Sequence, residues 1–243
     1  MQLDSVRILK IIGELSVIVG GILLSFYLQD LRQDEKKKAY KDQLIAELIV
    51  ASEQDLDYIN LIRENLNQCV ISVDTLIDDM LDGKRELSKR EVAEHYLVVS
   101  QKMYTSYFPQ NGTYEQLIAS GSLELVKSTN FRKVLLDNYT HLLTRNNALS
   151  RTLDDHYLIL TGTFGPFITV VPTEMKGQGF IYSNKKVKSF SVNDTFFNSQ
   201  AHLSQLIETK NLISNYLDLL DRFSESYEKL LIYYKDEEKN SFL

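Results

Sequence analysis

The chain has no tryptophan, a single cysteine, three prolines and ten glycines among its 243 residues. The lone cysteine, Cys69, excludes an intrachain disulfide and fits a reducing compartment. Proline and glycine are the residues that most often interrupt helices, so their scarcity favours long helices over a turn-rich β fold. We therefore predict an all-α protein.

Positive charge is also in deficit, because 27 Lys and Arg stand against 33 Asp and Glu for a net charge of −6. This balance argues against a protein that coats nucleic acid, although it leaves room for a local basic patch. Hydrophobic residues make up 44% of the chain, which is sufficient for a buried core in one or two domains.

The sequence signatures of catalysis are missing as well. None of the four histidines lies in an HExxH motif or at metal-ligand spacing from a cysteine or a second histidine. Asp154, Asp155 and His156 are adjacent, and adjacent residues on a helix point in different directions. No P-loop occurs, and Ser120 lacks the GxSxG frame of hydrolases. We expect no enzymatic activity, no metal and no cofactor.

One long hydrophobic run is present, ILKIIGELSVIVGGILLSFYL over residues 8–28. At about 1.5 Å rise per residue, a helix of this length matches a hydrocarbon core about 30 Å thick. A cleaved signal peptide is a competing interpretation, but no small-x-small cleavage site follows the run. A buried core helix is another, but residues 15–28 lack a polar face. We predict a transmembrane segment over residues 1–31.

The charges beside this run predict its orientation. Arg7 precedes it and Lys10 lies near its start, whereas the basic residues that follow it are Arg32, Lys36, Lys37, Lys38 and Lys41. Positive charge collects on the cytoplasmic side of a span. We therefore expect a single-pass protein of the cell inner membrane, with residues 32–243 as a cytoplasmic helical domain.

Small and polar residues inside the run predict more than an anchor. Ser16 and Gly20 form a small-xxx-small pair, as do Gly21 and Ser25, and such pairs favour self-association of helices in lipid. Glu14 shares a face with Gly21 and Ser25, and a carboxylate in lipid is costly unless it meets water or a partner. One interpretation is an oligomer with a polar seam or pore; the alternative is that Glu14 reaches the outer boundary beside Lys10.

Apolar residues recur at helical spacing through the rest of the chain. We predict helices at 34–82, 89–103, 114–120, 130–160 and 194–238, with an irregular loop or short hairpin near 161–192. Ser88 and Glu91 form a capping box before the second of these helices. A first heptad seam contains Ile59, Ile62, Leu66, Cys69, Val73, Leu76 and Met80. A second contains Ile213, Leu217, Leu220, Ser224, Tyr227, Leu231 and Tyr234. Two such seams predict an antiparallel bundle or an oligomeric coiled coil that continues from the membrane helix.

The segment after Pro172 combines cations with aromatic rings. Its residues of interest are Lys176, Phe180, Tyr182, Lys185, Lys186 and Lys188. Cations neutralise phosphates and aromatic faces stack on bases, so this loop is a candidate site for a nucleotide, an oligonucleotide or an anionic lipid headgroup. The alternative is a solvated basic loop whose two aromatic residues belong to the core.

Two blocks of sequence carry a family resemblance. The first contains Gly13, Glu14, Gly21, Ile22 and Leu23, and the second is TYEQLIASGSLELVKSTNFRKVLLDNY over residues 113–139. Together they resemble a family of uncharacterised bacterial single-pass membrane proteins, although the tryptophan usual at the end of that family's span is absent. The resemblance implies an architecture and no activity. The architecture is also similar to that of membrane effectors of anti-phage defence systems.

These observations predict one function and leave an alternative. The first is an oligomeric membrane effector, channel- or pore-forming, that a cytoplasmic sensing domain gates. The alternative is a membrane-tethered coiled-coil scaffold that recruits a partner protein. The expected partners are the lipid bilayer, further copies of the chain, and a nucleotide, an oligonucleotide or a protein at the cytoplasmic domain.

Overall fold

The computed structural model describes residues 2–82, 86–174 and 184–241, and most of them are helical, which confirms the all-α prediction. The chain divides into two compact units. One contains Met1–Leu48 and Gly112–Lys127, and the other contains Ile49–Asn111 and Ser128–Leu243. The smaller unit includes the short helices α3 (Gly112–Ala119) and η1 (Ser122–Leu125), which Gly121 joins with a φ of 70°.

The first helix, α1 (Gln2–Leu81), is a single α-helix of 80 residues that belongs to both units. It has no proline, and the predicted membrane segment and the predicted helix 34–82 both lie within it. The predicted heptad seam is confirmed, because its side chains from Ile59 to Leu76 are at most 4% exposed. Only Met80, at the end of the pattern, is half-buried.

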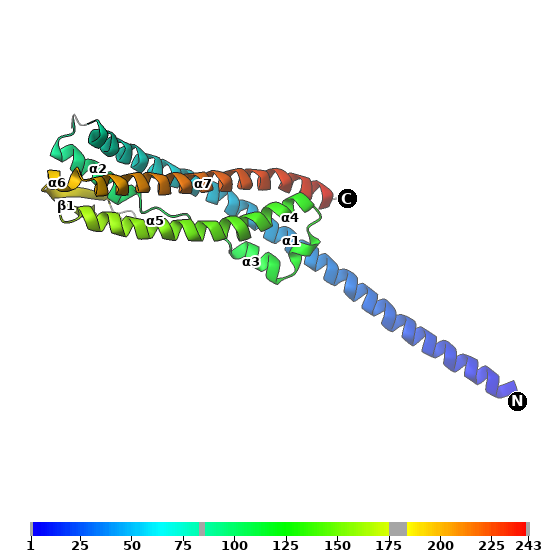
Figure 1. Ribbon diagram of the computed structural model, residues 1–243. Helices are drawn as coiled ribbons and strands as arrows, with labels where there is room; N and C mark the ends of the chain where they lie inside the picture. The colour runs from blue at the N-terminus through cyan, green and yellow to red at the C-terminus, as the bar shows by residue number, and fades with distance from the viewer. Residues whose placement is uncertain (1, 83–85, 175–183, 242–243) are drawn as a thin grey trace. The chain divides into compact units, whose positions relative to one another are not determined.

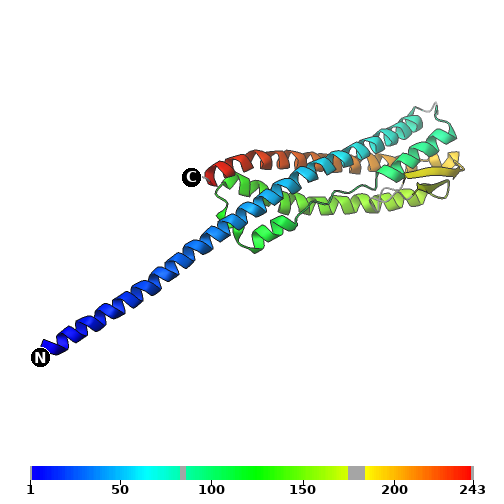
Figure 2. The same cartoon turned by 180° about the vertical axis from the view of Figure 1, so that it is seen from behind.

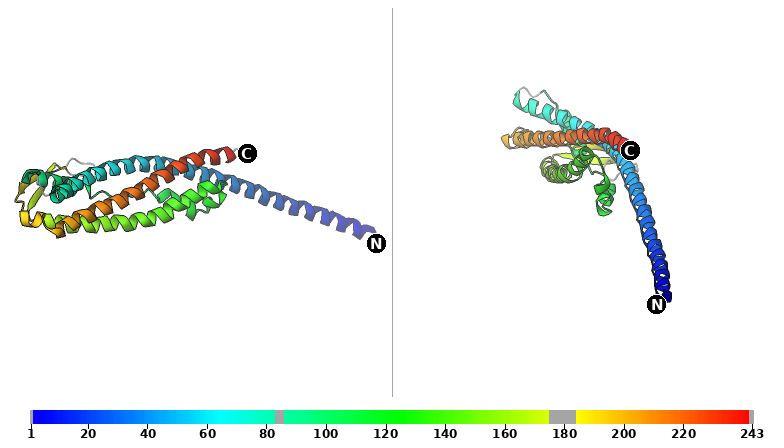
Figure 3. Two further views of the ribbon diagram at one scale, coloured as in Figure 1. Left: turned by 45° about the horizontal axis from the view of Figure 1, so that its top comes forward. Right: turned by 90° about the vertical axis from the view of Figure 1, so that its right-hand side faces the viewer.

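The last helix, α7 (Gln200–Ser241), runs antiparallel to the second half of α1. Polar contacts fix this direction, because the residue numbers fall on one helix as they rise on the other. Lys210 pairs with Asp74 at 2.7 Å, and Arg63 pairs with Asp221 at 2.7 Å. Figure 3 shows the two helices side by side within the larger unit.

The buried face of α7 differs from the predicted second seam. Ile213, Leu220 and Tyr227 are fully buried as expected. Between them, however, Tyr216 and Phe223 are buried, whereas the predicted Leu217 and Ser224 are only half-buried. The large aromatic rings bury more apolar area than leucine or serine. The buried face of α7 therefore contains Tyr216 and Phe223 in place of the predicted Leu217 and Ser224.

Two more long helices also belong to the larger unit. Helix α2 (Lys89–Lys102) begins with the predicted capping box, in which the Ser88 hydroxyl accepts from the Glu91 N–H at 3.3 Å. Helix α5 (Leu143–Phe164) runs antiparallel to α7, with its His156 hydrogen-bonded to Thr209. Figures 1 and 2 both show α5 beside α7.

Several element bounds differ from the sequence-based ones. The predicted helix 130–160 consists of α4 (Thr129–Leu136), a π-helical turn η2 (Asp137–Leu142) and α5. The predicted helix 194–238 is divided into α6 (Asp194–Phe197) and α7. Between α5 and α6, an antiparallel hairpin of β1 (Ile168–Glu174) and β2 (Asn184–Phe190) pairs Ile168 with Phe190.

Candidate functional site

The apolar segment of α1 is uncovered. Every side chain from residue 13 to residue 40 is exposed, including Val17 at 76% and Leu23 at 63%. Among the described residues, one helix is long and apolar enough to cross a membrane, and it is this one. Its most apolar stretch is not buried in the protein, so it is not a core helix of this chain.

The predicted helix-packing residues all lie on this uncovered segment. Nothing in the described structure lies within 4 Å of where a Cβ on Gly20 or Gly21 would be. The Ser25 hydroxyl donates to the Gly21 carbonyl at 2.9 Å, so its hydrogen bond is made within the helix. Glu14 and Ser16 are exposed on the same helix. Packing at these small residues therefore needs another molecule.

The predicted basic loop lies only partly within the described residues. Lys176, Phe180 and Tyr182 are outside them, whereas Lys185, Lys186 and Lys188 lie on β2. The Lys185 ammonium donates to the Ser100 carbonyl of α2 at 2.8 Å, and burial lowers its pKa. Lys186 and Lys188 are exposed. Because side chains alternate along a strand, those two share a face that Lys185 does not.

Several buried polar residues of the larger unit are hydrogen-bonded to one another. Asp55 of α1 accepts from the Tyr227 hydroxyl at 3.0 Å and from the Gln110 backbone N–H at 3.1 Å. Tyr227 also bonds the Tyr107 hydroxyl at 2.8 Å. The second buried histidine, His202, bonds the Tyr96 hydroxyl. Each group has a structural partner, as buried polar groups require, and no group of His, Cys, Asp or Glu in the described residues is placed to hold a metal.

A concave site lies between α7 and the continuous run of α4, η2 and α5, all in the larger unit. This cationic groove has a volume of about 680 Å³. Its polar lining residues are Asn130, Lys133, Asp137, His141, Arg145, Arg222, Glu225, Ser226, Lys229 and Tyr233. The volume is that of a small-molecule site.

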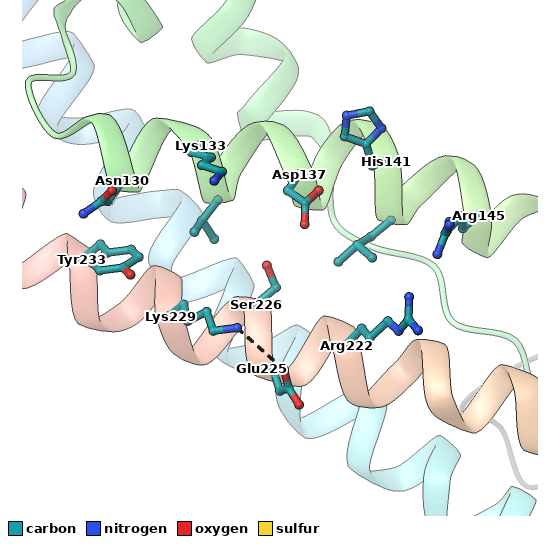
Figure 4. Close-up of a pocket in the computed structure, with 12 residues that line it drawn as sticks. Asn130, Lys133, Asp137, His141, Arg145, Arg222, Glu225, Ser226, Lys229 and Tyr233 are labelled. Atoms are coloured by element: carbon teal, nitrogen blue, oxygen red, sulfur yellow. Dashed lines mark ion pairs between the residues drawn. The ribbon is translucent and has the colours of Figure 1, made fainter.

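Charged side chains lie along the whole groove, and Lys133 and Lys229 lie between its middle and Tyr233 (Figure 4). Arg145 and Arg222 lie across from each other at one end, Asp137 and Ser226 lie in the middle, and Tyr233 lies at the other end. Glu225 pairs with Lys229 on its own helix at 3.7 Å. Within the part of the chain that the structure describes, no ion pair neutralises either arginine.

The sequence did not reveal this groove, for a physical reason. Lys133, Asp137, His141 and Arg145 recur every four residues, which on a helix is also the pattern of an ordinary solvated face. The residues opposite them lie between 77 and 100 positions later, on α7, and form a second such face. Only the antiparallel packing of the helices brings the two faces together.

Comparison with protein-family models, with curated proteins and with solved structures finds no match to this chain. The family resemblance of the two sequence blocks therefore stays a prediction, and the geometry alone supports a function.

Proposed function

We propose that the protein is a single-pass membrane effector whose spans associate and whose larger unit receives the signal that controls them. The observation that carries this proposal is the continuity of α1. One helix without a break contains both the uncovered apolar segment and the buried seam packed on α7. In this proposal, the seam is the part of α1 on which the larger unit acts, and the apolar segment is the part of the same helix that associates.

The exposed small residues of the apolar segment support association of the spans. Gly20 and Gly21 offer a surface where a second helix backbone can approach closely. Glu14 would be costly among lipid tails, and a polar seam between spans would lower that cost. In this proposal, residues 32–243 are cytoplasmic, because the basic residues that follow the span favour that side.

The test uses the full-length chain reconstituted into vesicles. Gly21→Leu should reduce the oligomeric mass in mild detergent and the ion flux across the vesicles, because the larger side chain separates the helices. Glu14→Ala should change the flux while the protein still inserts. Val17→Leu, an enlargement of an already apolar side chain, serves as the matched control. A monomeric wild-type protein that is recovered without detergent would refute the proposal.

A tethered scaffold remains the second candidate, and exposed apolar side chains favour it. Leu158 and Ile159 of α5 are 64% and 60% exposed, so this helix presents an apolar patch to a partner. A scaffold needs its span only as an anchor. Unchanged flux in Glu14→Ala, together with loss of a co-purifying protein in Leu158→Ser, would favour it. From the architectural similarity alone, we also propose that the effector acts in anti-phage defence, which phage challenge of cells with and without the gene tests.

A further inference from the structure

We propose that the cationic groove binds a nucleotide that carries more than one phosphate. The proposal deepens the proposed function, because it names the chemical class of the signal, but binding itself does not depend on what the spans do.

The arginine pair defines the phosphate end. Arg145 and Arg222 come from different helices and converge at one end of the groove (Figure 4). Two like charges held on facing helices repel each other, so their convergence favours an anion between them. The guanidinium group binds phosphate oxygens in a bidentate fork, which makes arginine suited to this role. His141, on the same stretch of the groove, adds another donor.

Part of the remaining lining matches the sugar and base of a nucleotide, and Lys133 and Lys229, which lie between the middle of the groove and Tyr233 (Figure 4), add two further cations. The Asp137 carboxylate in the middle of the groove can accept hydrogen bonds from ribose hydroxyls, and Ser226 lies opposite it (Figure 4). At the far end, the Tyr233 ring offers a face on which a base can stack. A bare inorganic anion would need neither the carboxylate nor the ring, and Asp137 would repel it.

The π-helical turn places these groups. Asp137 and His141 both belong to η2, and single π-helical turns inside α-helices are frequent at functional sites. The same turn contains Asn138, which is fully buried while neither its amide nitrogen nor its amide oxygen has a hydrogen-bond partner in the described structure. A buried amide without partners is unfavourable. The turn costs stability but sets the position of Asp137, so we attribute its presence to that position.

Helix α7 links the groove to α1. Arg222 and Ser226 face the groove, while the adjacent Phe223 and Tyr227 are buried, and Tyr227 bonds Asp55 of α1. A ligand that draws α5 and α7 together therefore acts on a helix that is bonded to α1. In the proposed function, the signal passes from the ligand to α7 and through the Tyr227–Asp55 hydrogen bond to α1.

Binding is tested by isothermal titration of the full-length protein in detergent with ATP, GTP, CTP and UTP in turn. At least one should bind with a dissociation constant below about 1 mM. Arg145→Ala and Arg222→Ala should each weaken that binding at least tenfold, whereas Arg151→Ala, an exposed arginine of α5 outside the groove, should not. Tyr233→Phe should retain the affinity that Tyr233→Leu loses.

Four results would overturn the inference. Absence of binding by all four nucleotides, or binding that both arginine variants retain, removes the groove as the site. Pyrophosphate that binds as tightly as the best nucleotide excludes recognition of a base. Binding to phosphatidylglycerol vesicles that needs Arg145, with no nucleotide binding, would assign the phosphate chemistry to lipid headgroups. By contrast, a wild-type protein that binds a nucleotide through both arginines but passes no ions would refute the proposed function and leave this assignment of the groove intact.

Discussion

The hydroxyl group of Tyr227 offers the sharpest test of how α7 is bonded to α1. It donates to the Asp55 carboxylate at 3.0 Å and shares a 2.8 Å hydrogen bond with Tyr107. Burial raises the pKa of Tyr227, so the phenol stays protonated and remains a donor at physiological pH. Tyr227→Phe removes these hydrogen bonds and leaves the ring packing unchanged.

The expected loss of stability can be worked out from the two bonds. A hydrogen bond to a charged group contributes about 1.5–3 kcal/mol, and one between neutral groups about 0.5–1.5 kcal/mol. Asp55 keeps its bond from the Gln110 N–H at 3.1 Å, which limits the cost of leaving it buried. Tyr227→Phe should therefore lower the free energy of unfolding by about 2–4 kcal/mol, or about 30- to 700-fold in the folding equilibrium constant.

Urea unfolding of the full-length protein in mild detergent measures this loss. Because the chain has no tryptophan, far-ultraviolet circular dichroism is the suitable signal. Tyr40→Phe is the matched control, since the Tyr40 side chain is 42% exposed, and it should change the free energy of unfolding by less than about 0.5 kcal/mol. A double-mutant cycle with Asp55→Ala should give a coupling energy of about 1–3 kcal/mol.

Two results would refute the reasoning. The first is a Tyr227→Phe protein whose free energy of unfolding equals that of the control. The second is a coupling energy near zero between Asp55 and Tyr227, which would mean that the two side chains do not interact in solution. In either case, the route from the groove through α7 to α1 would lose its main polar contact.

Three further predictions concern buried groups. Burial lowers the pKa of His202 below 6.5, so the free energy of unfolding should fall as the pH drops below that value. His202→Gln should reduce this fall between about pH 7.5 and 5.5. An unchanged pH dependence of the free energy of unfolding would contradict the prediction. Asn138→Leu removes an amide without partners and should raise the free energy of unfolding by about 1–3 kcal/mol in urea titrations, whereas a lower value would show that the amide is satisfied. Burial raises the pKa of Cys69 to about 12, so a disulfide reagent should label its thiol only after unfolding, and rapid labelling of the folded protein would count against the buried seam.

Local patterns in the sequence predicted the features that depend on local physics. The seam of Ile59, Ile62 and Leu66 follows from helical period, because one face of a helix must be apolar to be buried. The start of α2 follows from capping, since Ser88 and Glu91 satisfy backbone N–H groups that every helix start leaves open. The apolar segment of α1 follows from composition alone.

The sequence patterns did not predict the features that depend on which helix surfaces pack together. On α7, the choice of Tyr216 and Phe223 over Leu217 and Ser224 for the buried face depends on the space left by neighbouring helices. The π-helical turn at Asp137–Leu142 has no local signature, because its residues are equally compatible with an α-helix. The division between α6 and α7 likewise occurs without a proline.

The sequence by itself determined that this is a helical protein with an uncovered apolar segment, because composition, period and length act within a single helix. Only the tertiary structure determined that two arginines lie together in one groove. Arg145 and Arg222 lie 77 positions apart and belong to helices that each present a polar face to water. Antiparallel packing of α5 on α7 places those faces opposite each other and leaves a groove, and no property of either helix taken alone contains that juxtaposition.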